Sequence, residues 1–451
     1  MKAFILKIYY SILAMLARRY LKKTKPYIIG ITWSIGKTSS RMIIYQIIQR
    51  FSKKHTVYTS NRNFNGEFGM SLSIFCIEDY EVTVLGLLKL LMTAINKAFS
   101  PKKKYDIIIL EYGIDHPWEM EFLLNIAKPH IAIVTKIDKV HSMQFTSPDI
   151  IAQEKYKLAF GAQNAVFLNI DDEYSVSGKG KCKVTTFLYS TSGEMEWSDL
   201  QFSNVNFQKD EENIKINFDA LYPWDKKINI TSNLFGQENY GYVTLWLNVA
   251  SQCLKDLDKK SLLRRYDGND ITLDLELQSG RFSVLKWVGD SILIDSTYNA
   301  SPLSIKKLIE NIFSLRNNIY PDYKIILALG DMRELGDYTE QEHRQIAWII
   351  SQVGDFAILV WESMELYAYD ELGKIGFSEE KMASFRSSTE AGKRIKEIIE
   401  KNGADKFIVL FKWSQNTIFM EEALKQVLAD KSEKDKLVRQ SEFWMSKKWV
   451  E

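Results

Sequence analysis

Ile28-Ile-Gly-Ile-Thr-Trp-Ser-Ile-Gly-Lys-Thr-Ser-Ser40 carries the strongest structural signal in this chain. The apolar run 27–31 predicts a short buried strand, Gly36-Lys37-Thr38 predicts a loop, and the amphipathic run 41–50 predicts a helix. Strand, loop and helix in this order are typical of a phosphate loop, in which backbone N–H groups and the helix N-terminus bind phosphate oxygens. The sequence therefore predicts a nucleotide site here, the alternative being a chance Gly-Lys-Thr at a helix start.

The loop spacing is a variant of the usual phosphate-loop pattern. That pattern has a glycine five residues before the Gly-Lys pair, where this chain has Ile31, and Gly30 lies one position earlier. In such loops the lysine, here Lys37, reaches the outer phosphates, and the hydroxyl of Thr38 reaches Mg²⁺.

Composition indicates an ordinary globular enzyme. With 451 residues, we expect two or three domains. Apolar residues make up 46% and charged residues 26%, and the net charge is +2, so neither general disorder nor a nucleic-acid-binding surface is indicated. Cys76, Cys182 and Cys253 lie far apart without a Cys-x-x-Cys pair, which argues against a zinc site and a disulfide framework and fits a reducing cytosol.

The N-terminus raises the question of membrane contact. Residues 1–17 are apolar except for Lys2, Lys7 and Ser11, and the basic run 18–25 follows. The apolar run is too short to span a bilayer, so we expect an amphipathic, basic helix over residues 1–26 that lies on the inner leaflet. The alternative is a helix packed on the body of the enzyme.

Two buried strands end beside candidate metal ligands. The apolar runs 105–110 and 130–135 are typical of parallel strands buried on both faces, and Glu111 and His141 follow them. Because active-site residues of open parallel sheets gather at the carboxyl ends of strands, we expect Glu111 and His141 to share a crevice with the phosphate loop. Taken singly, each is more often a loop residue; together with Lys37 and Thr38 they favour a Mg²⁺ site.

The remaining sequence predicts a second domain. Residues 183–231 alternate with period two and predict a β-rich, antiparallel excursion, and a helix is predicted over 234–254. From about residue 275 strands and helices alternate again. We therefore predict an α/β protein: a P-loop parallel-sheet ATPase domain at 27–274 with a β-rich excursion, then a Rossmann-like C-terminal α/β domain at 275–451.

Further motifs run through both predicted domains in one order. They are Gly30-Ile-Thr-Trp-Ser-Ile-Gly-Lys-Thr38, Asn63-Phe-Asn-Gly-Glu-Phe-Gly69, Glu111-Tyr-Gly-Ile-Asp-His-Pro117, Lys128-Pro-His-Ile-Ala-Ile-Val-Thr135, Asp295-Ser-Thr-Tyr-Asn-Ala-Ser-Pro302, Leu329-Gly-Asp-Met-Arg-Glu-Leu-Gly336 and Lys412-Trp-Ser-Gln-Asn-Thr417. With these motifs the chain resembles the Mur ligase family, and within it the ligases that add D-alanyl-D-alanine to UDP-N-acetylmuramoyl-tripeptide.

The resemblance implies an ATP- and Mg²⁺-dependent amide ligase of peptidoglycan precursor synthesis. ATP would phosphorylate a substrate carboxylate, and an amine would displace phosphate from the acyl phosphate. The implied catalytic residues are Lys37, His141 and Lys155, with Lys155 carbamylated and joining Thr38, Glu111 and His141 as a Mg²⁺ ligand. The implied nucleotide contacts are Gly30, Thr32, Ser34, Gly36, Lys37, Thr38, Ser39, Asn239, Arg281, Asp295 and Asn299.

The implied partners are a UDP-muramoyl-peptide and D-Ala-D-Ala, for a cytoplasmic monomer without a nucleic-acid partner. Because only residues 1–26 precede the first strand, we expect the family's N-terminal UDP-binding domain to be absent. Two other functions stay open: a Mur-type amide ligase acting on a different or lipid-linked substrate, and a non-catalytic nucleotide-binding protein.

Four tryptophans stand where the family has glycine. Trp33, Trp118, Trp361 and Trp413 occupy turns or sites of close backbone approach, where an indole is poorly suited. This pattern leads to the hypothesis that the gene uses UGA as a glycine codon. These tryptophans would then arise from translating the gene with the wrong genetic code. The alternative is four genuine tryptophans, one of which obstructs the phosphate loop.

Overall fold

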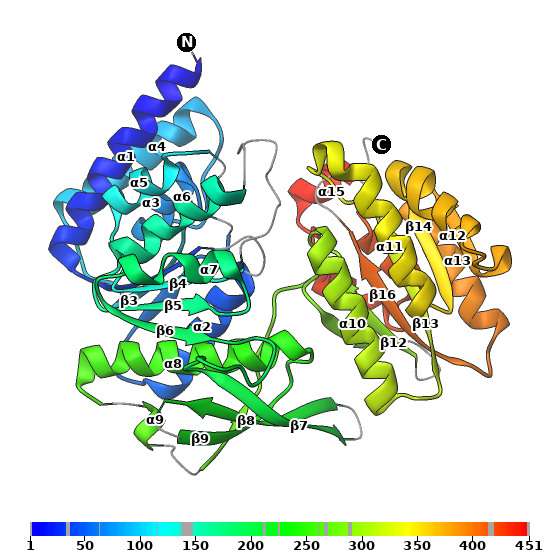
Figure 1. Cartoon of the computed structure of the whole chain (residues 1–451). Coiled ribbons are helices and arrows are strands. Elements are labelled where there is room, and N and C mark those ends of the chain that lie inside the picture. The colour runs from blue at the N-terminus through cyan, green and yellow to red at the C-terminus, as the bar shows by residue number, and fades with distance from the viewer. Residues whose placement is uncertain are drawn as a thin grey trace. The chain divides into compact units, whose positions relative to one another are not determined.

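The computed structural model describes the chain except residues 1, 33–36, 63, 115, 137–147, 211–212, 224–225, 261, 266–268, 287–290, 414–418 and 449–451. The described chain divides into two compact units, Met1–Leu275 and Glu276–Glu451 (Figure 1). Each unit has its own sheet and its own core.

A six-stranded parallel sheet forms the centre of the N-terminal unit, in the order β2-β3-β1-β4-β5-β6. Its strands are β1 (Tyr27–Thr32), β2 (Val57–Thr59), β3 (Ile107–Glu111), β4 (Ile131–Val134), β5 (Ala165–Asn169) and β6 (Thr185–Tyr189). The first five are buried along their whole length, as their unbroken apolar sequences predict. The prediction of an antiparallel excursion from residue 183 was wrong for β6, which pairs in parallel with β5.

The N-terminal unit also contains α-helices. They are α1 (Lys2–Thr24), α2 (Lys37–Phe51), α3 (Glu67–Phe75), α4 (Val84–Phe99), α5 (Glu119–Ile126), α6 (Pro148–Gly161), α7 (Glu173–Ser177), α8 (Gln237–Asp258) and α9 (Leu262–Arg265). Helix α3 begins inside the polar segment 60–69, because Phe68 and the apolar residues that follow pack into the core. No helix in the described ranges is both long and apolar enough to cross a bilayer.

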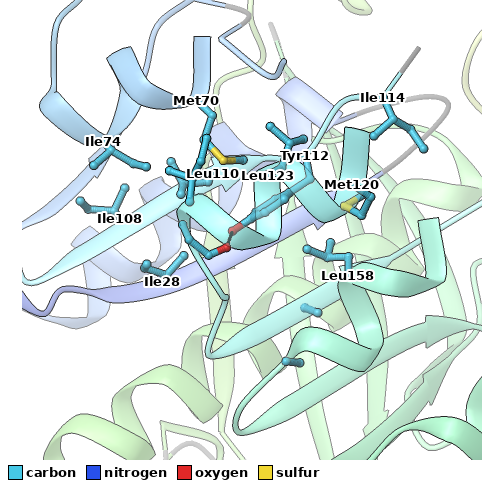
Figure 2. Close-up of a cluster of buried hydrophobic side chains, with 14 of the residues drawn as sticks. Ile28, Met70, Ile74, Ile108, Leu110, Tyr112, Ile114, Met120, Leu123 and Leu158 are labelled. Atoms are coloured by element: carbon cyan, nitrogen blue, oxygen red, sulfur yellow. Dashed lines mark hydrogen bonds between the residues drawn. The ribbon is translucent and has the colours of Figure 1, made fainter. Parts of the chain in front are cut away.

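The first helix packs on the body of the N-terminal unit. It contacts α3, α4 and α5, and it buries Leu13, Leu16 and Tyr20. Figure 2 shows side chains from β1, β3, α3 and α5 around Tyr112, whose hydroxyl donates to the carbonyl of Ala127 at 2.8 Å. This core fixes the carboxyl end of β3, where Glu111 lies.

A small second sheet completes the N-terminal unit. It has the order β10-β9-β8-β7, formed by β7 (Gln201–Asp210), β8 (Asn213–Tyr222), β9 (Lys226–Ser232) and β10 (Asp270–Leu273). The first three strands are antiparallel, as their alternating sequence predicts, whereas β10 pairs in parallel with β9.

The C-terminal unit is a second α/β structure, with the strand order β11-β12-β16-β13-β14-β15. Its strands are β11 (Ser283–Lys286), β12 (Ile292–Ser296), β13 (Tyr323–Gly330), β14 (Phe356–Val360), β15 (Met382–Phe385) and β16 (Lys406–Lys412). All pairs are parallel except β11 with β12. Its α-helices are α10 (Pro302–Ile319), α11 (Thr339–Val353), α12 (Asp370–Lys374), α13 (Ser388–Lys401), α14 (Glu421–Val427) and α15 (Glu442–Lys448).

The three cysteines carry free thiols and lie apart in the N-terminal unit. Burial raises the pKa of the Cys76 thiol to about 12 and also raises the pKa of Cys182 and Cys253.

Candidate functional site

The carboxyl ends of β1 and β3 meet at one edge of the N-terminal sheet. Glu111, the last residue of β3, is level with Ile31 of β1. Thr32 ends β1, and α2 begins at Lys37 on the other side of the loop. The predicted strand and helix are therefore present on either side of residues 33–36, which lie outside the described residues, with Glu111 at the edge where a nucleotide would bind.

Part of the predicted phosphate site lies outside the described residues. This applies to Ser34, Gly36 and His141, and the side chains of Lys37 and Thr38 are likewise outside the description, although their backbone opens α2. Ser39 is half-buried in the first turn of α2.

Gly30 and Thr32 have clear structural roles within the sheet. A Cβ atom on Gly30 would lie 2.8 Å from Cε2 of Tyr112 and 2.9 Å from Cβ of Pro129, so only glycine fits. The Thr32 hydroxyl is fully buried and donates to the carbonyl of Tyr112 at 2.8 Å. Both residues thus join the end of β1 to the segment that follows β3.

Glu111 forms a buried ion pair that sequence reasoning missed. Nε of Arg41 lies 3.0 Å from Oε1 of Glu111, and both side chains are 1% exposed. A second contact holds the same guanidinium, because Nη1 of Arg41 donates to the carbonyl of Arg62 at 3.3 Å. Among the described residues, neither carboxylate oxygen of Glu111 accepts a hydrogen bond. Burial of a carboxylate with its hydrogen-bonding capacity unused is costly, so these oxygens are suited to a cation ligand.

Lys155 lies on α6, which packs against β4 and β1. Lys155 is only 3% exposed. The neighbouring Glu154 is also buried, accepting the backbone N–H of Met120 at 3.1 Å and pairing with Lys157 at 2.7 Å. The fold thus fixes the helix turn that carries Lys155.

The Mg²⁺ expected at this edge fits the donors present. Glu111 offers two buried oxygens without hydrogen bonds, and hard cations take oxygen ligands. Within the described ranges no three His, Cys, Asp or Glu side chains form a complete metal site, and His141 lies outside those ranges.

Asn239 lies in the first turn of the long helix α8, which begins at Gln237. Its side-chain amide donates to the carbonyl of Phe235, and its backbone N–H donates to Gly236 at 2.9 Å. These bonds hold Asn239 at the helix N-terminus, a position where anions bind favourably.

The C-terminal unit gathers a second set of polar groups at the ends of β12 and β16. Oδ1 of Asp295 accepts the backbone N–H and the hydroxyl of Thr297, at 3.0 Å and 2.7 Å. Its Oδ2 is buried without a hydrogen-bond partner among the described residues, and burial raises the pKa of the carboxyl. A buried acceptor left in this state is a site that a donor on a ligand can satisfy.

Lys412 belongs to this set and was not predicted as a site residue. It is 6% exposed, and its Nζ donates to the hydroxyl of Ser296 at 3.2 Å. Burial lowers the pKa of its ammonium group to about 7, with a further contribution from Arg281. Its signal in the sequence is its place at the end of a buried strand, the position that identified Glu111.

The other predicted residues of this unit differ in burial. The Arg281 guanidinium lies 4.2 Å from the centre of the Tyr298 ring. Asn299 is exposed, and its side-chain oxygen accepts the N–H of Ala300 at 2.9 Å. Arg439, which was also missed, donates to the carbonyl of Thr297 at 2.9 Å from a distant segment.

Three tryptophans have left-handed backbone conformations, namely Trp118 (φ +77°), Trp197 (φ +68°) and Trp361 (φ +88°). Trp413 is fully buried against β13, where a Cβ atom on Gly330 would overlap its ring. Trp33 lies outside the described residues.

Comparison with known proteins follows the two units of the structure. The model of the Mur ligase middle domain matches residues 31–241, and that of the Mur ligase, glutamate ligase domain, matches residues 280–438. The chain belongs to the Mur ligase family. The predicted order of a P-loop α/β domain and a second α/β domain is thereby confirmed, and so is the prediction of an ATP-dependent ligase.

Two curated relatives of this Mur ligase carry the same name, UDP-N-acetylmuramoyl-tripeptide–D-alanyl-D-alanine ligase. The Bacillus subtilis protein is 23% identical over 417 residues, which are 92% of this chain and 79% of that protein. The Borreliella burgdorferi protein is 26% identical over 341 residues, 74% of this chain and 62% of that protein. A crystal structure of MurF ligase from Thermotoga maritima in complex with ADP has a TM-score of 0.69 at 19% identity, covering 95% of this chain and 84% of that chain.

Proposed function

We propose that this Mur ligase joins D-alanyl-D-alanine to a UDP-muramoyl-tripeptide at the expense of ATP, as a cytoplasmic monomer of peptidoglycan precursor synthesis. The observation that carries the proposal is the buried carboxylate of Glu111, level with the end of β1 and with both oxygens free of hydrogen bonds from described residues. The names of the curated relatives support the choice of substrates.

In this proposal the N-terminal unit binds the phosphates and the metal. Lys37 neutralises charge on the transferred phosphoryl group, and Thr38, Glu111, His141 and carbamylated Lys155 hold Mg²⁺. The ion pair with Arg41 orients Glu111 toward the sheet edge. Gly30, Thr32, Ser34, Gly36 and Ser39 shape the phosphate loop, and Asn239 adds a nucleotide contact.

Bound Mg²⁺ supplies positive charge that offsets the negative charge of the phosphates. The carboxylate of the muramoyl peptide is a poor acyl donor, and its phosphorylation provides a leaving group that the amine of D-Ala-D-Ala displaces. In the C-terminal unit, Arg281, Asp295 and Asn299 are the proposed nucleotide contacts. We add Lys412, because a lysine beside Asp295 gains positive charge when a phosphate approaches.

A phosphate-release assay with ATP, Mg²⁺, UDP-muramoyl-tripeptide and D-Ala-D-Ala tests the proposal. It uses the chain with Trp33, Trp118, Trp361 and Trp413 each replaced by glycine, beside the unaltered chain. We expect release that requires both substrates. Nucleotide binding without turnover in both proteins would instead establish a non-catalytic protein, and turnover only with a lipid-linked muropeptide would establish the other ligase.

A matched pair of variants ties the activity to the site. Glu111→Gln should lower turnover at least about a hundredfold, because it removes a charged metal ligand. Glu340→Gln, on the exposed side of α11, should leave turnover unchanged. Because Glu111→Gln leaves Arg41 buried and unpaired, thermal unfolding is measured for both variants, and full activity of folded Glu111→Gln would refute the assigned role.

The proposal includes peripheral contact between residues 1–25 and the inner face of the membrane. The support is the basic, apolar sequence of α1, which has no acidic residue. A chain that begins at Tyr27 should bind vesicles less than the full chain, and equal partition would refute this contact.

A further inference from the structure

An apolar stripe runs along the exposed side of α1. Ile5, Ile8, Ile12 and Met15 are 59%, 47%, 37% and 55% exposed, and their spacing places them on one side of the helix. The opposite side of α1 is buried in the N-terminal unit through Leu13, Leu16 and Tyr20, among others. The stripe is therefore not needed to hold α1 in place.

A second exposed stripe runs along α4. Leu85, Leu88, Met92 and Phe99 are 79%, 53%, 66% and 61% exposed, while Leu90, Ala94 and Ala98 of the same helix are buried. Helix α4 is therefore apolar on two sides, and one of them has no cover among the described residues. Isolated exposed apolar residues are ordinary, but a continuous row on a helix is typical of an interaction site.

Contacts between the helices join the two stripes into one surface. The Tyr9 hydroxyl donates to the carbonyl of Leu87 at 2.8 Å, so the two helices run side by side in the same direction. The Arg19 guanidinium, four residues beyond Met15, lies 4.2 Å from the centre of the Phe99 ring. Arg19 continues the α1 stripe, and Phe99 belongs to the α4 stripe. The two stripes therefore lie side by side where the helices meet. We name these eight apolar residues the α1–α4 surface.

The charged residues on α1 and α4 themselves are all basic. Neither helix contains an acidic residue, and a shallow groove on α1 is lined by apolar side chains together with Lys7, Ser11 and Arg18. Lys89 lies on α4, and Lys102 and Lys104 follow it, whereas Lys97 donates to the carbonyl of Phe75 and Lys103 pairs with Asp106. Acidic residues lie outside the two helices: Glu78 accepts from Tyr58, Asp79 pairs with Arg62, Glu81 precedes α4, and Glu67 of α3 lies near Lys7.

We infer that the α1–α4 surface docks on the interface of an anionic phospholipid bilayer, with both helices lying in the plane of the membrane. Apolar side chains enter the acyl boundary while the surrounding lysines and arginines meet lipid phosphates. The inference rests on the membrane contact proposed above for residues 1–25. It extends that contact by assigning half of the docking surface to α4. An anionic bilayer is favoured over a protein partner because the cations surround the apolar rows without any acidic counterpart on either helix.

Vesicle sedimentation with full-length variants tests the inference, using phosphatidylcholine vesicles with or without phosphatidylglycerol. One variant carries Ile8→Gln and Ile12→Gln, another Leu85→Gln and Leu88→Gln, and the control carries Leu366→Gln, a 59% exposed leucine of the C-terminal unit. We expect binding only with phosphatidylglycerol, weaker at high salt, about tenfold lower in each double variant and unchanged in the control.

Each other outcome is decisive. If only the α1 variant loses binding, the two-helix surface is refuted while the contact through α1 stands. If the unaltered chain does not bind, both are refuted. Self-association at protein concentrations where vesicles are not bound would identify a second copy as the occupant and also refute the inference. Ligase activity in solution is measured separately, so failure here leaves the proposed reaction untouched.

A second, independent observation concerns the tryptophans. Trp118, Trp197 and Trp361 have φ near +70° to +90°, whereas Trp246, Trp348 and Trp444 lie in helices. A left-handed conformation places Cβ too close to the following carbonyl, and for a bulky residue it is a rare outlier. Glycine adopts it without strain.

We propose that positions 118, 197 and 361 are glycine in the protein made by its own cell, because its gene reads UGA as glycine. Glycine at position 197 is supported by backbone conformation alone. This position is additional to Trp33, Trp118, Trp361 and Trp413, which were identified by comparison with the family's motifs. Codons provide the test: UGA is expected at 118, 197 and 361, and UGG at 246 and 348. UGG at 118 and 361 would overturn the proposal, and UGG at 197 alone would remove that position. Peptide masses of the protein isolated from its own cell should correspond to glycine at each UGA.

Discussion

Trp118 occupies the N-cap of α5, with a positive φ, no capping hydrogen bond from its side chain and 74% of that side chain exposed. We predict that Trp118→Gly raises the free energy of unfolding by about 1 kcal/mol, since the left-handed strain disappears and glycine is a good N-cap. Little packing is lost, because the indole contacts Lys157 at the surface, at 4.9 Å from its ring centre. Denaturant unfolding measures the change.

A tryptophan in a regular helix is the control for this prediction. Trp348 is 53% exposed on α11, so Trp348→Gly should lower the free energy of unfolding by about 1 kcal/mol through helix propensity. Equal destabilisation by both substitutions would show that the backbone at position 118 is not strained.

Lys412 couples stability to pH. Burial lowers its pKa in the folded protein to about 7, whereas an unfolded lysine titrates near about 10.4. Between these values the unfolded chain binds more protons, so the contribution of Lys412 to stability rises with pH, by up to about 1.4 kcal/mol per pH unit. Lys412→Met should therefore flatten the rise in unfolding free energy between about pH 7 and pH 10.

The control for this measurement is Lys396→Met, at an exposed position on α13. It should leave the pH dependence as it is in the unaltered chain. An identical slope in Lys412→Met would mean that the folded protein keeps Lys412 charged throughout this range.

At the scale of single residues, the sequence correctly placed Glu111 at the end of a buried strand, and its role in the site stays a prediction. The same rule applied to β16 would have selected Lys412. Arg41 was missed because a helix pattern does not reveal that an arginine in the second turn faces a buried carboxylate. Arg439 was missed because its contact with Thr297 joins residues 142 positions apart.

At the scale of elements, β1 depends on one close approach. Gly30→Ala should destabilise the chain by about 1–3 kcal/mol, because the added methyl group meets Tyr112 and Pro129 at less than 3 Å. Thermal unfolding measures the effect. Gly180→Ala is the control, since nothing lies within 4 Å of a Cβ atom there, and similar losses at both positions would contradict the packing argument.

The central strands could be predicted for a physical reason. Parallel strands are buried on both faces, so unbroken apolar sequence marks them, and β1, β3 and β4 were predicted close to their observed bounds. Whether β6 joins the parallel sheet or the antiparallel one depends on a partner distant in sequence, which alternation does not reveal. For α1, the amphipathic sequence predicted the helix. It did not show that one apolar side of this helix packs into the core of the N-terminal unit.

At the scale of the whole molecule, the two units have separate cores. The cluster of the C-terminal unit contains residues from Leu285 to Leu437 and none from the N-terminal unit. A fragment of residues 276–451 should therefore fold alone. We expect dispersed amide resonances and a cooperative thermal transition, whereas a narrow amide spectrum would show that folding of this unit requires residues 1–275.

The cysteines give the molecule a practical property. Since burial raises the pKa of all three thiols, to about 12 at Cys76, very little thiolate is present at neutral pH, and thiolate is the form that reacts with maleimides and oxidants. The chain therefore offers a low chemical background for site-directed labelling. One cysteine introduced in place of Met92 would carry an environment-sensitive dye, whose emission would report directly whether that position leaves water when vesicles are added.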